Sequence, residues 1–261
     1  MRSHLHAVRR SLSLRRFTAP LILALALSSL GFVQLAGCAS TAHVVADARS
    51  SYFDAATLDL VRLLPPPPAD VSAETRAELD LMLQIQAKRS PAEAARAKAD
   101  AEVSVYRFAD ALGDPPAFNA KSLPRFNAVF AKVLHEEGTV ISLGKDRFAR
   151  PRPFALEPRL DPVIATPPNG SYPSGHSMWA HAAGLLLADM VPERRAQILK
   201  RADEYSYNRV VAGVHYPSDV EGGKLAGTTF AAFLFVAPEF QADFAAAKSE
   251  LRKTLKLPPQ P

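Results

Sequence analysis

The chain has 261 residues, 48% of them hydrophobic, which is enough for one domain with a sizeable buried core. Its 31 basic and 26 acidic side chains give a formal net charge of +5. Five arginines lie within residues 1–16, so the rest of the chain holds 26 basic and 26 acidic side chains and is formally neutral. A nucleic-acid-binding protein, which would need a basic domain, is therefore not supported, and any strong positive field must be local.

The first 37 residues have the layout of a secretory signal peptide. Residues 1–16 are basic, residues 17–35 are mostly apolar, and small residues follow. Two serines and a glutamine interrupt the apolar run, which is too short and too broken to predict a membrane-spanning helix. Residues 1–37 are therefore not counted in the folded core.

Cys38 is the one cysteine in the sequence, so it cannot form an internal disulfide. It follows Leu35-Ala36-Gly37 and resembles the lipobox of bacterial lipoproteins, in which cleavage leaves a lipidated cysteine at the new N-terminus. Ala39 in the next position favours the outer membrane. The sequence thus predicts a lipoprotein-type signal over 1–37, a tether over 38–46, and a membrane contact through a lipid anchor at Cys38 on the periplasmic side of the envelope. Secretion of a soluble periplasmic protein with an incidental thiol is the alternative.

Helical patterns begin after the tether. Residues 47–64 are loosely helical, and four consecutive prolines at 65–68 end that pattern and form a stiff connector. Ser72 is the expected N-cap of a helix whose apolar residues share one face. A Ser-Pro-Ala-Glu capping box over 90–93 predicts a long helix that runs towards Leu112.

The second half of the chain is also helical, with one proline-rich interruption. The cleanest amphipathic pattern starts at Phe126 and is expected to close at Gly138. Six prolines in the span 139–170 predict an ordered loop there. Three further helices are expected over 176–190, 192–213 and 240–255.

A Ser-Asp-Val-Glu capping box at 218–221 predicts the start of another helix. The helix has a face of small residues that would let a neighbouring helix approach closely, namely Gly222, Gly223, Ala226 and Gly227. No alternating strand pattern persists and no repeat is visible. Residues 47–261 are therefore predicted to form a single all-α domain, a helical bundle.

Three clusters between residues 145 and 219 carry the chemistry. A buried phosphate dianion beside a nucleophile needs cations, backbone donors and a nucleophile that is neutral when it attacks. In the first cluster, six residues separate Lys145 from Arg152-Pro153. Arginine offers a planar fork that matches two phosphate oxygens, and lysine offers a movable point charge. Taken alone, this basic cluster is also typical of a solvated loop.

The second cluster spans residues 170–177 and reads Gly-Ser-Tyr-Pro-Ser-Gly-His-Ser. Ser174 supplies a hydroxyl, and Gly175 lets the backbone approach a ligand. His176 lies at the start of a helix whose free N–H groups and dipole favour an anion. An ordinary N-cap turn with an incidental histidine accounts for the spacing equally well.

The third cluster surrounds His215. Pro217 disfavours helical geometry at Tyr216, so His215 is expected on a turn just before a helix. Asp219, in the first helical turn, could reach back to one imidazole nitrogen and leave the other free to attack phosphorus. Arg209, six residues before His215, would bring a third cation. The alternative is a structural one, in which the acidic residue favours only the helix dipole.

Together the clusters resemble the three-part signature of the type-2 phosphatidic-acid phosphatase superfamily, which it shares with vanadium haloperoxidases. That pattern is Lys, six residues, Arg-Pro; then Pro-Ser-Gly-His; then Ser-Arg, five residues, His, three residues, Asp. Each named position is met except that Asn208 stands in place of the serine. Residues 170–177 are closer still to the bacterial class A non-specific acid phosphatases. The resemblance implies a helical bundle of this phosphatase and haloperoxidase type, with a metal-independent acid phosphatase activity on a broad range of phosphate monoesters.

The resemblance also implies a role for each residue of the signature. His215 would form a phosphohistidine, Asp219 would orient it, and His176 would protonate the leaving alcohol and later activate water. The need for a protonated His176 beside a neutral His215 predicts an acid pH optimum. The implied phosphate-binding residues are Lys145, Arg152, Ser174, Gly175 and Arg209.

No metal or other cofactor is implied. His176 and His181 fall on different helical faces, and no other grouping of histidine and acidic residues has metal-ligand spacing. The expected partners are small phosphomonoester substrates, and a homo-oligomer is compatible with the sequence. Three other functions remain open: a vanadium-dependent haloperoxidase, a phosphatase acting on lipid phosphates, and a lipoprotein that binds phosphate without turning it over.

Overall fold

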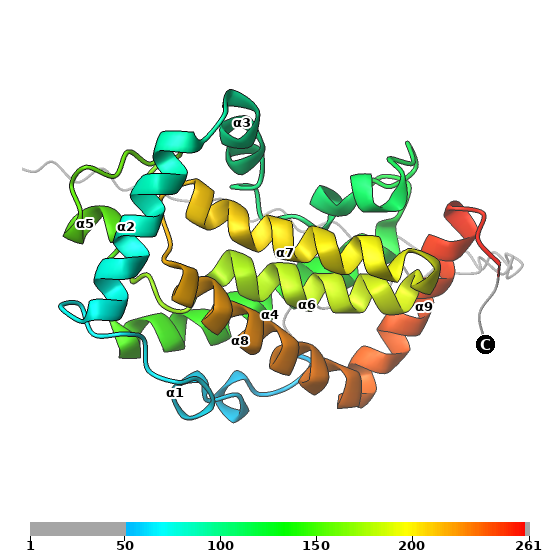
Figure 1. The fold of residues 1–261 in the computed structure, drawn as a ribbon. Coiled ribbons are helices and arrows are strands. Elements are labelled where there is room, and N and C mark those ends of the chain that lie inside the picture. Colours follow the sequence, from blue (N-terminus) through cyan, green and yellow to red (C-terminus); the bar gives the residue numbers. More distant parts are fainter. Residues whose placement is uncertain (1–50, 259–261) are drawn as a thin grey trace, which may run out of the picture. The chain divides into compact units, whose positions relative to one another are not determined.

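The computed structural model describes residues 51–258 (Figure 1). The chain divides into Met1–Ala46 and Asp47–Pro261, and the description below concerns the second unit. Over the described range the regular structure is helical with no strand, which confirms the predicted all-α fold. Cys38, together with the predicted signal over 1–37 and tether over 38–46, lies outside the described residues.

Nine α-helices are present in the described part of the chain. They are α1 (Leu60–Leu63), α2 (Ala73–Lys88), α3 (Pro91–Ala99), α4 (Pro124–Phe148), α5 (Pro153–Leu156), α6 (Gly175–Met190), α7 (Arg195–Val211), α8 (Pro217–Val236) and α9 (Pro238–Thr254). Short 3₁₀ turns lie at Ala55–Thr57, Val105–Phe108, Asp110–Leu112 and Pro192–Arg194.

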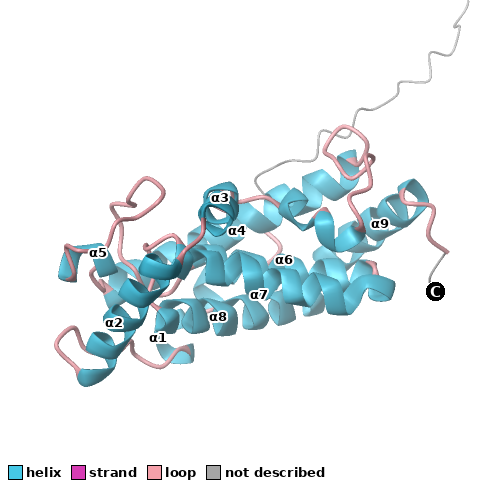
Figure 2. Ribbon diagram, turned by 45° about the horizontal axis from the view of Figure 1, so that its top comes forward, coloured by secondary structure: helices cyan, strands magenta, loops and turns pink. Residues whose placement is uncertain are grey.

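Helix α6 is the centre of the bundle. Its residues are apolar or small on nearly every side, and most of them are buried, which is typical of a helix surrounded by protein. Helices α7 and α8 pack along it on two sides, and α4 packs against both α6 and α9 (Figures 1 and 2). The N-terminal end of α6 is therefore held between elements that each bring functional side chains.

Helix α3 is shorter than the sequence predicts. The capping box of Ser90 and Glu93 is present, but the helix ends at Ala99 and does not run on towards Leu112. Asp100 is fully buried, and its carboxylate accepts hydrogen bonds from Arg107 and Arg201 at 2.8 and 2.6 Å. These tertiary contacts of Asp100 outweigh the helical spacing of the apolar residues between 101 and 112, so the helix does not continue.

Helix α4 is longer than predicted and corrects the expected loop. It passes through Gly138 and Gly144 and ends at Phe148, so the residues after Thr139 continue the helix. A Cβ at Gly144 would lie 3.1 Å from the Leu60 side chain, so this glycine serves packing and does not end the helix. As a consequence Lys145 lies in the last turn of a helix and not on a loop.

Helix α8 begins earlier than predicted. Pro217 is its first residue and Tyr216 its N-cap, so the expectation that Ser218 caps the helix is wrong. The Tyr216 N–H donates to the Asp219 carboxylate at 2.9 Å, which gives Asp219 the place of the acidic residue in a capping box. Ser218 is turned towards α2 and donates from its backbone N–H and its hydroxyl to Glu78 at 2.6 and 2.9 Å.

The small-residue face of α8 is confirmed, and it lies against α6. A Cβ at Gly222 would stand 2.6 Å from the Tyr172 ring. A Cβ at Gly223 or Gly227 would overlap the carbonyl oxygen of Ser174 or Met178. Glycine is required at 223 and 227 because the backbones of α8 and α6 are in direct contact there, and at 222 because the Tyr172 ring lies against α8.

Membrane-spanning capacity is limited in residues 51–258. No single helix there is both long and apolar enough to be a candidate span. Helices α8 and α9 qualify only as a joined pair, and that pair is bent by 95° at its break.

We predict that Gly227→Ala destabilises the protein by about 1–3 kcal/mol, since the new methyl group forces α8 away from α6. Gly138→Ala is the matched control, because a Cβ there meets nothing within 4 Å. In the middle of α4 this change should instead stabilise the fold by roughly 0.5–1 kcal/mol. Urea unfolding followed by circular dichroism measures both, and equal stabilities of the two variants would contradict the close α6–α8 contact.

Candidate active site

One cavity of about 270 Å³ brings the three sequence clusters together. Side chains of α4, α6 and the end of α7 line it, together with residues from the segments that precede α5, α6 and α8. Its polar lining consists of Glu137, Lys145, Arg152, Asn169, His176, Arg209 and His215, and the remaining lining consists of Val103, Leu134, Gly138, Ile141, Pro167 and Gly175. A second cavity of about 200 Å³ beside α2, α3 and α7 contains none of the predicted site residues.

His215 is buried at the inner end of this cavity, where both ring nitrogens have a partner. Nδ1 lies 3.1 Å from a carboxylate oxygen of Asp219, and Nε2 lies 2.9 Å from Nη1 of Arg152. Because a guanidinium can only donate, Nε2 is the acceptor and Nδ1 carries the proton that Asp219 accepts. Burial and the positive charge of Arg152 lower the pKa of His215 well below its usual value, so the ring is neutral. The tautomer leaves the Nε2 lone pair on the cavity side.

Asp219 is fully buried and contacts His215 without lining the cavity. One oxygen accepts from Nη1 of Arg150 at 2.7 Å, and the other accepts from the Ser171 hydroxyl, the Tyr216 N–H and His215. Burial raises the pKa of Asp219, and Arg150 acts in the opposite direction. Because both oxygens of Asp219 accept hydrogen bonds, the surrounding donors favour the ionised carboxylate over the protonated acid.

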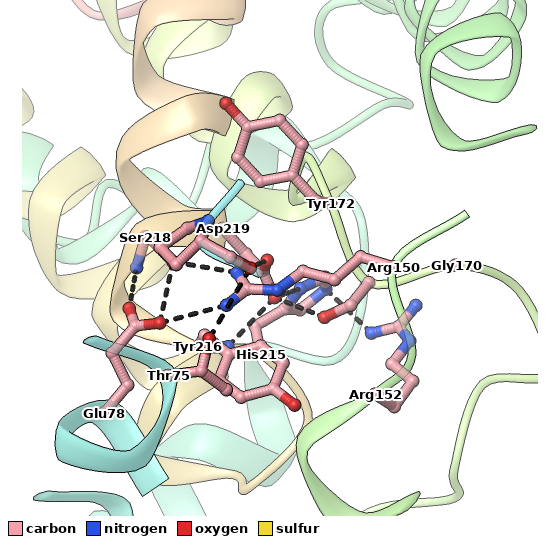
Figure 3. Close-up of polar contacts among 12 residues, drawn as sticks. Thr75, Glu78, Arg150, Arg152, Gly170, Tyr172, His215, Tyr216, Ser218 and Asp219 are labelled. Carbon is pink, nitrogen blue, oxygen red and sulfur yellow. Dashed lines mark hydrogen bonds and ion pairs between the residues drawn. The ribbon is translucent and has the colours of Figure 1, made fainter. Parts of the chain in front are cut away.

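Arg150 connects the Asp219 carboxylate to α2 (Figure 3). Its second nitrogen donates to Glu78 at 3.0 Å, and its guanidinium lies 3.8 Å from the centre of the Tyr216 ring. This arginine lies inside the first sequence cluster, but the signature spacing selected Arg152 and gave Arg150 no role. In the structure Arg150 binds the Asp219 carboxylate, whereas Arg152 lines the cavity.

Lys145 and Arg152 are buried cations on the cavity wall. Lys145 Nζ donates to the carbonyl oxygens of Gly170 and Ser171 at 2.7 and 3.2 Å. Burial, together with repulsion from Arg152, lowers the pKa of Lys145 to about 7. Arg152 donates to Asn169 and to the Val214 carbonyl, and burial lowers its pKa to about 10, so it remains charged.

Arg209 is the third cation and is 2% exposed. Within residues 51–258, its Nε and Nη1 atoms have no hydrogen-bond partner although both are buried. Burial and repulsion from Arg152 lower its pKa to about 10, which keeps it charged near neutral pH. A buried guanidinium with unpaired donors on a cavity wall is a favourable position for an oxyanion.

His176 is the second residue of α6 and lines the cavity. Its Nε2 lies 3.0 Å from the carbonyl oxygen of Ala101, so Nε2 carries a proton and Nδ1 is the free nitrogen of the neutral ring. Burial, followed by the charge of Arg209, lowers the pKa of His176 to about 3. The histidine is thus neutral in the protein without an anion.

Ser174 and Gly175 lie at the N-terminus of α6, but they face different surroundings. Gly175 lines the cavity at the first helical position. Ser174 is the N-cap, and its hydroxyl accepts from the Ser177 N–H at 3.3 Å. Ser174 is fully buried and is not part of the cavity lining. Six of the eight predicted site residues therefore line one cavity, while Ser174 and Asp219 lie directly behind it.

Asn208, the position that departs from the signature, is also accounted for. Its Nδ2 donates to Asp100 at 2.7 Å, on the same buried carboxylate that receives Arg107 and Arg201. Asn208 does not line the cavity. Asn208 thus links α7 to Asp100 in the segment after α3. The residue that follows Asp100 is Ala101, whose carbonyl oxygen contacts His176.

Sequence reasoning missed Glu137, Ser171 and Asn169. Glu137 carried a usable signal, because it is an acidic residue on the apolar face of α4, four residues after Val133 and four before Ile141. Ser171 and Asn169 carried none, since their partners Asp219 and Arg152 are brought near only by the fold. No group of three or more histidine, cysteine or acidic residues within 51–258 is arranged to hold a metal ion.

Comparison with known proteins finds a family model and several sequence relatives that match part of this chain. The family model described as the PAP2 superfamily matches residues 126–242, a range that contains all eight predicted site residues. The non-specific acid phosphatase of Providencia stuartii is 32% identical over 159 residues, which cover 57% of this chain and 61% of that protein. The acid phosphatase of Zymomonas mobilis subsp. mobilis is 32% identical over 138 residues, which cover 50% and 51% of the two chains. This chain therefore aligns with about half to three fifths of the length of these relatives.

A solved structure shares the fold. A bacterial vanadium-dependent iodoperoxidase superposes with a TM-score of 0.53 at 21% identity, over 67% of this chain and 52% of the other. At that identity the similarity concerns the helical architecture alone. Residues 126–242 thus match the PAP2 superfamily model, and the sequence relatives named acid phosphatases align over part of the chain.

Proposed function

We propose that the protein is a phosphatase that hydrolyses phosphate monoesters, with His215 as the nucleophile. The observation that carries the proposal is the neutral His215, oriented by Asp219, in a cavity lined by three buried cations. The sequence relatives named acid phosphatases support the same reaction. The mostly apolar remainder of the lining imposes few hydrogen bonds on the alcohol portion, which supports a broad substrate range of the class A non-specific kind.

In the first step, phosphate oxygens bind Lys145, Arg152, Arg209 and the N–H of Gly175. Arg152 moves its Nη1 contact from His215 to a phosphate oxygen, which frees the Nε2 lone pair. Nε2 attacks phosphorus, the bond from phosphorus to the ester oxygen breaks, and a phosphohistidine forms. Asp219 stabilises the positive charge that develops on the ring.

The leaving oxygen needs a proton, and His176 is placed to supply it. The neutral ring gains a proton when the dianion enters, because the negative charge offsets the repulsion from Arg209. His176 gives this proton to the leaving alcohol and becomes a base. It then removes a proton from water, the water oxygen attacks phosphorus, and the P–N bond breaks to release inorganic phosphate and neutral His215.

We predict that His215→Ala lowers the turnover of p-nitrophenyl phosphate at least about 1,000-fold, because the nucleophile is lost. The assay contains a chelator, and the phosphoenzyme is trapped by rapid quenching and mass spectrometry. His135→Ala is the control, since His135 lies on the exposed side of α4, away from the cavity.

Equal turnover by the wild type and His215→Ala would overturn the nucleophile assignment. A haloperoxidase remains the competing function, because the same cations can hold vanadate. Halide oxidation by peroxide with added vanadate, without phosphatase activity in its absence, would favour that function over ours.

We predict that kcat/KM falls as the pH rises above about 7, because Lys145 loses its charge there. The sign follows from a pKa lowered to about 7: the ammonium is present below that pH and lost above it. The expected acid optimum then has two causes: the charge on Lys145, which strengthens phosphate binding, and the proton on His176, which the leaving alcohol needs. The measurement is a profile of kcat/KM from pH 5 to pH 9.

Lys145→Arg provides the matched variant, since a guanidinium keeps its charge across this range. The fall in kcat/KM should move to higher pH in this variant. A wild-type profile that is flat or rising up to pH 9, or one that Lys145→Arg leaves unchanged, would contradict the role of Lys145.

A further inference from the structure

Glu137 is a buried carboxyl group on the cavity wall that the proposed reaction does not use. It is 4% exposed and extends from α4 into the cavity lining. Within the described residues its buried Oε1 atom has no hydrogen-bond partner. A carboxyl oxygen that has lost its hydration and gained no partner in return is unfavourable, which points to a ligand that supplies the missing contact.

The position of Glu137 places it beside the part of the cavity where an alcohol portion would lie. Glu137, Ile141 and Lys145 are spaced by four residues and share one face of α4, with about 12 Å of helix axis between the first and the last. Arg152 contacts His215 and its charge acts on Lys145, so these cations lie near the Lys145 end of this helix face. A monoester whose phosphate binds those cations extends its alcohol portion towards the wall that holds Glu137.

Three of the other polar groups that line the cavity are cations, namely Lys145 from α4, Arg209 from α7 and Arg152 from the segment before α5. The others are Asn169 and the neutral rings of His176 and His215. Burial raises the pKa of Glu137 to about 8, and Lys145 lowers it only in part. Glu137 is therefore a neutral acid at acid and neutral pH and does not repel a phosphate dianion.

A neutral carboxyl group can donate one hydrogen bond and accept others, which is the pattern that complements an alcohol hydroxyl. The neighbouring wall offers a hydroxyl no other partner, since Leu134, Gly138 and Ile141 have no polar side chain. The Oε1 atom lies 3.7 Å from the place that a Cβ on Gly175 would occupy, so it is close to the backbone expected to bind phosphate.

We propose that Glu137 is a specificity-determining residue that hydrogen-bonds a hydroxyl group on the alcohol portion of the substrate. The site then favours phosphate monoesters of polyhydroxy alcohols over esters whose alcohol has no further hydroxyl. This inference rests on the proposed phosphatase function and names a substrate class for it.

The test compares kcat/KM for glycerol 1-phosphate with kcat/KM for phenyl phosphate at pH 6 in the wild type, Glu137→Leu and Glu137→Gln. Glu137→Leu should lower the ratio of the two values about tenfold, because the hydroxyl loses its partner while phenyl phosphate never used it. Glu137→Gln should keep the ratio within about threefold, since an amide also donates and accepts. Glu136→Gln is the control: Glu136 is equally buried, but its carboxylate accepts from the Tyr52 N–H and does not line the cavity.

The possible outcomes separate this inference from the function on which it rests. If Glu137→Leu hydrolyses phenyl phosphate and its ratio stays within twofold of the wild type, the inference is overturned and the phosphatase assignment stands. A Glu137→Leu variant that is folded but loses both activities equally would also overturn it, because Glu137 would then act on the phosphate group. If the wild type hydrolyses neither ester, the proposed function falls and this inference falls with it.

Discussion

The buried carboxylate of Asp219 is the interaction on which the site depends. It receives the N–H that begins α8, the imidazole of His215, a hydroxyl from the segment before α6, and Arg150, which in turn binds Glu78 of α2. A buried ion pair needs further hydrogen bonds on both partners. Here both oxygens of Asp219 and both terminal nitrogens of Arg150 have them, whereas Arg150 Nε has no partner within the described residues. The Asp219 carboxylate therefore caps a helix, joins three segments and fixes the tautomer of His215, the proposed nucleophile. A change at Asp219 would alter the fold and the candidate site together.

The cations around His215 explain why a histidine can serve as a nucleophile in this cavity. Lys145, Arg152 and Arg209 each disfavour a further positive charge, and burial acts in the same direction, so the ring stays neutral. Yet Asp219 is ready to stabilise the positive charge that appears once the ring has reacted. The ring is kept neutral by cations that line the cavity, whereas the carboxylate that can stabilise a later positive charge contacts Nδ1 on the other side of the ring.

Much of the architecture could be predicted from the sequence, and the failures have identifiable causes. Caps such as Ser72 and the Ser90 box gave the helix starts correctly, because capping is a local interaction. Gly138 misled the prediction of α4, since a single glycine ends a helix only where the surrounding structure allows it. The signature residues came together as expected, but the partners Arg150, Ser171 and Glu137 did not stand out. Arg150 and Glu78 are 72 residues apart, and no spacing rule connects positions that only the packing of α2 brings together.

The unpaired guanidinium of Arg209 has a consequence for the end of a catalytic cycle. Its free donors and the neighbouring cations attract any tetrahedral dianion, whether that group is still esterified or already released. The attraction that helps capture a substrate at low concentration also retards the departure of inorganic phosphate. Under the proposed phosphatase function we therefore expect product release, rather than bond breaking, to limit turnover for esters with good leaving groups. A cell with abundant free phosphate would hold most copies of such an enzyme in the product-bound form, so the surrounding phosphate concentration would regulate the activity without a separate regulatory site.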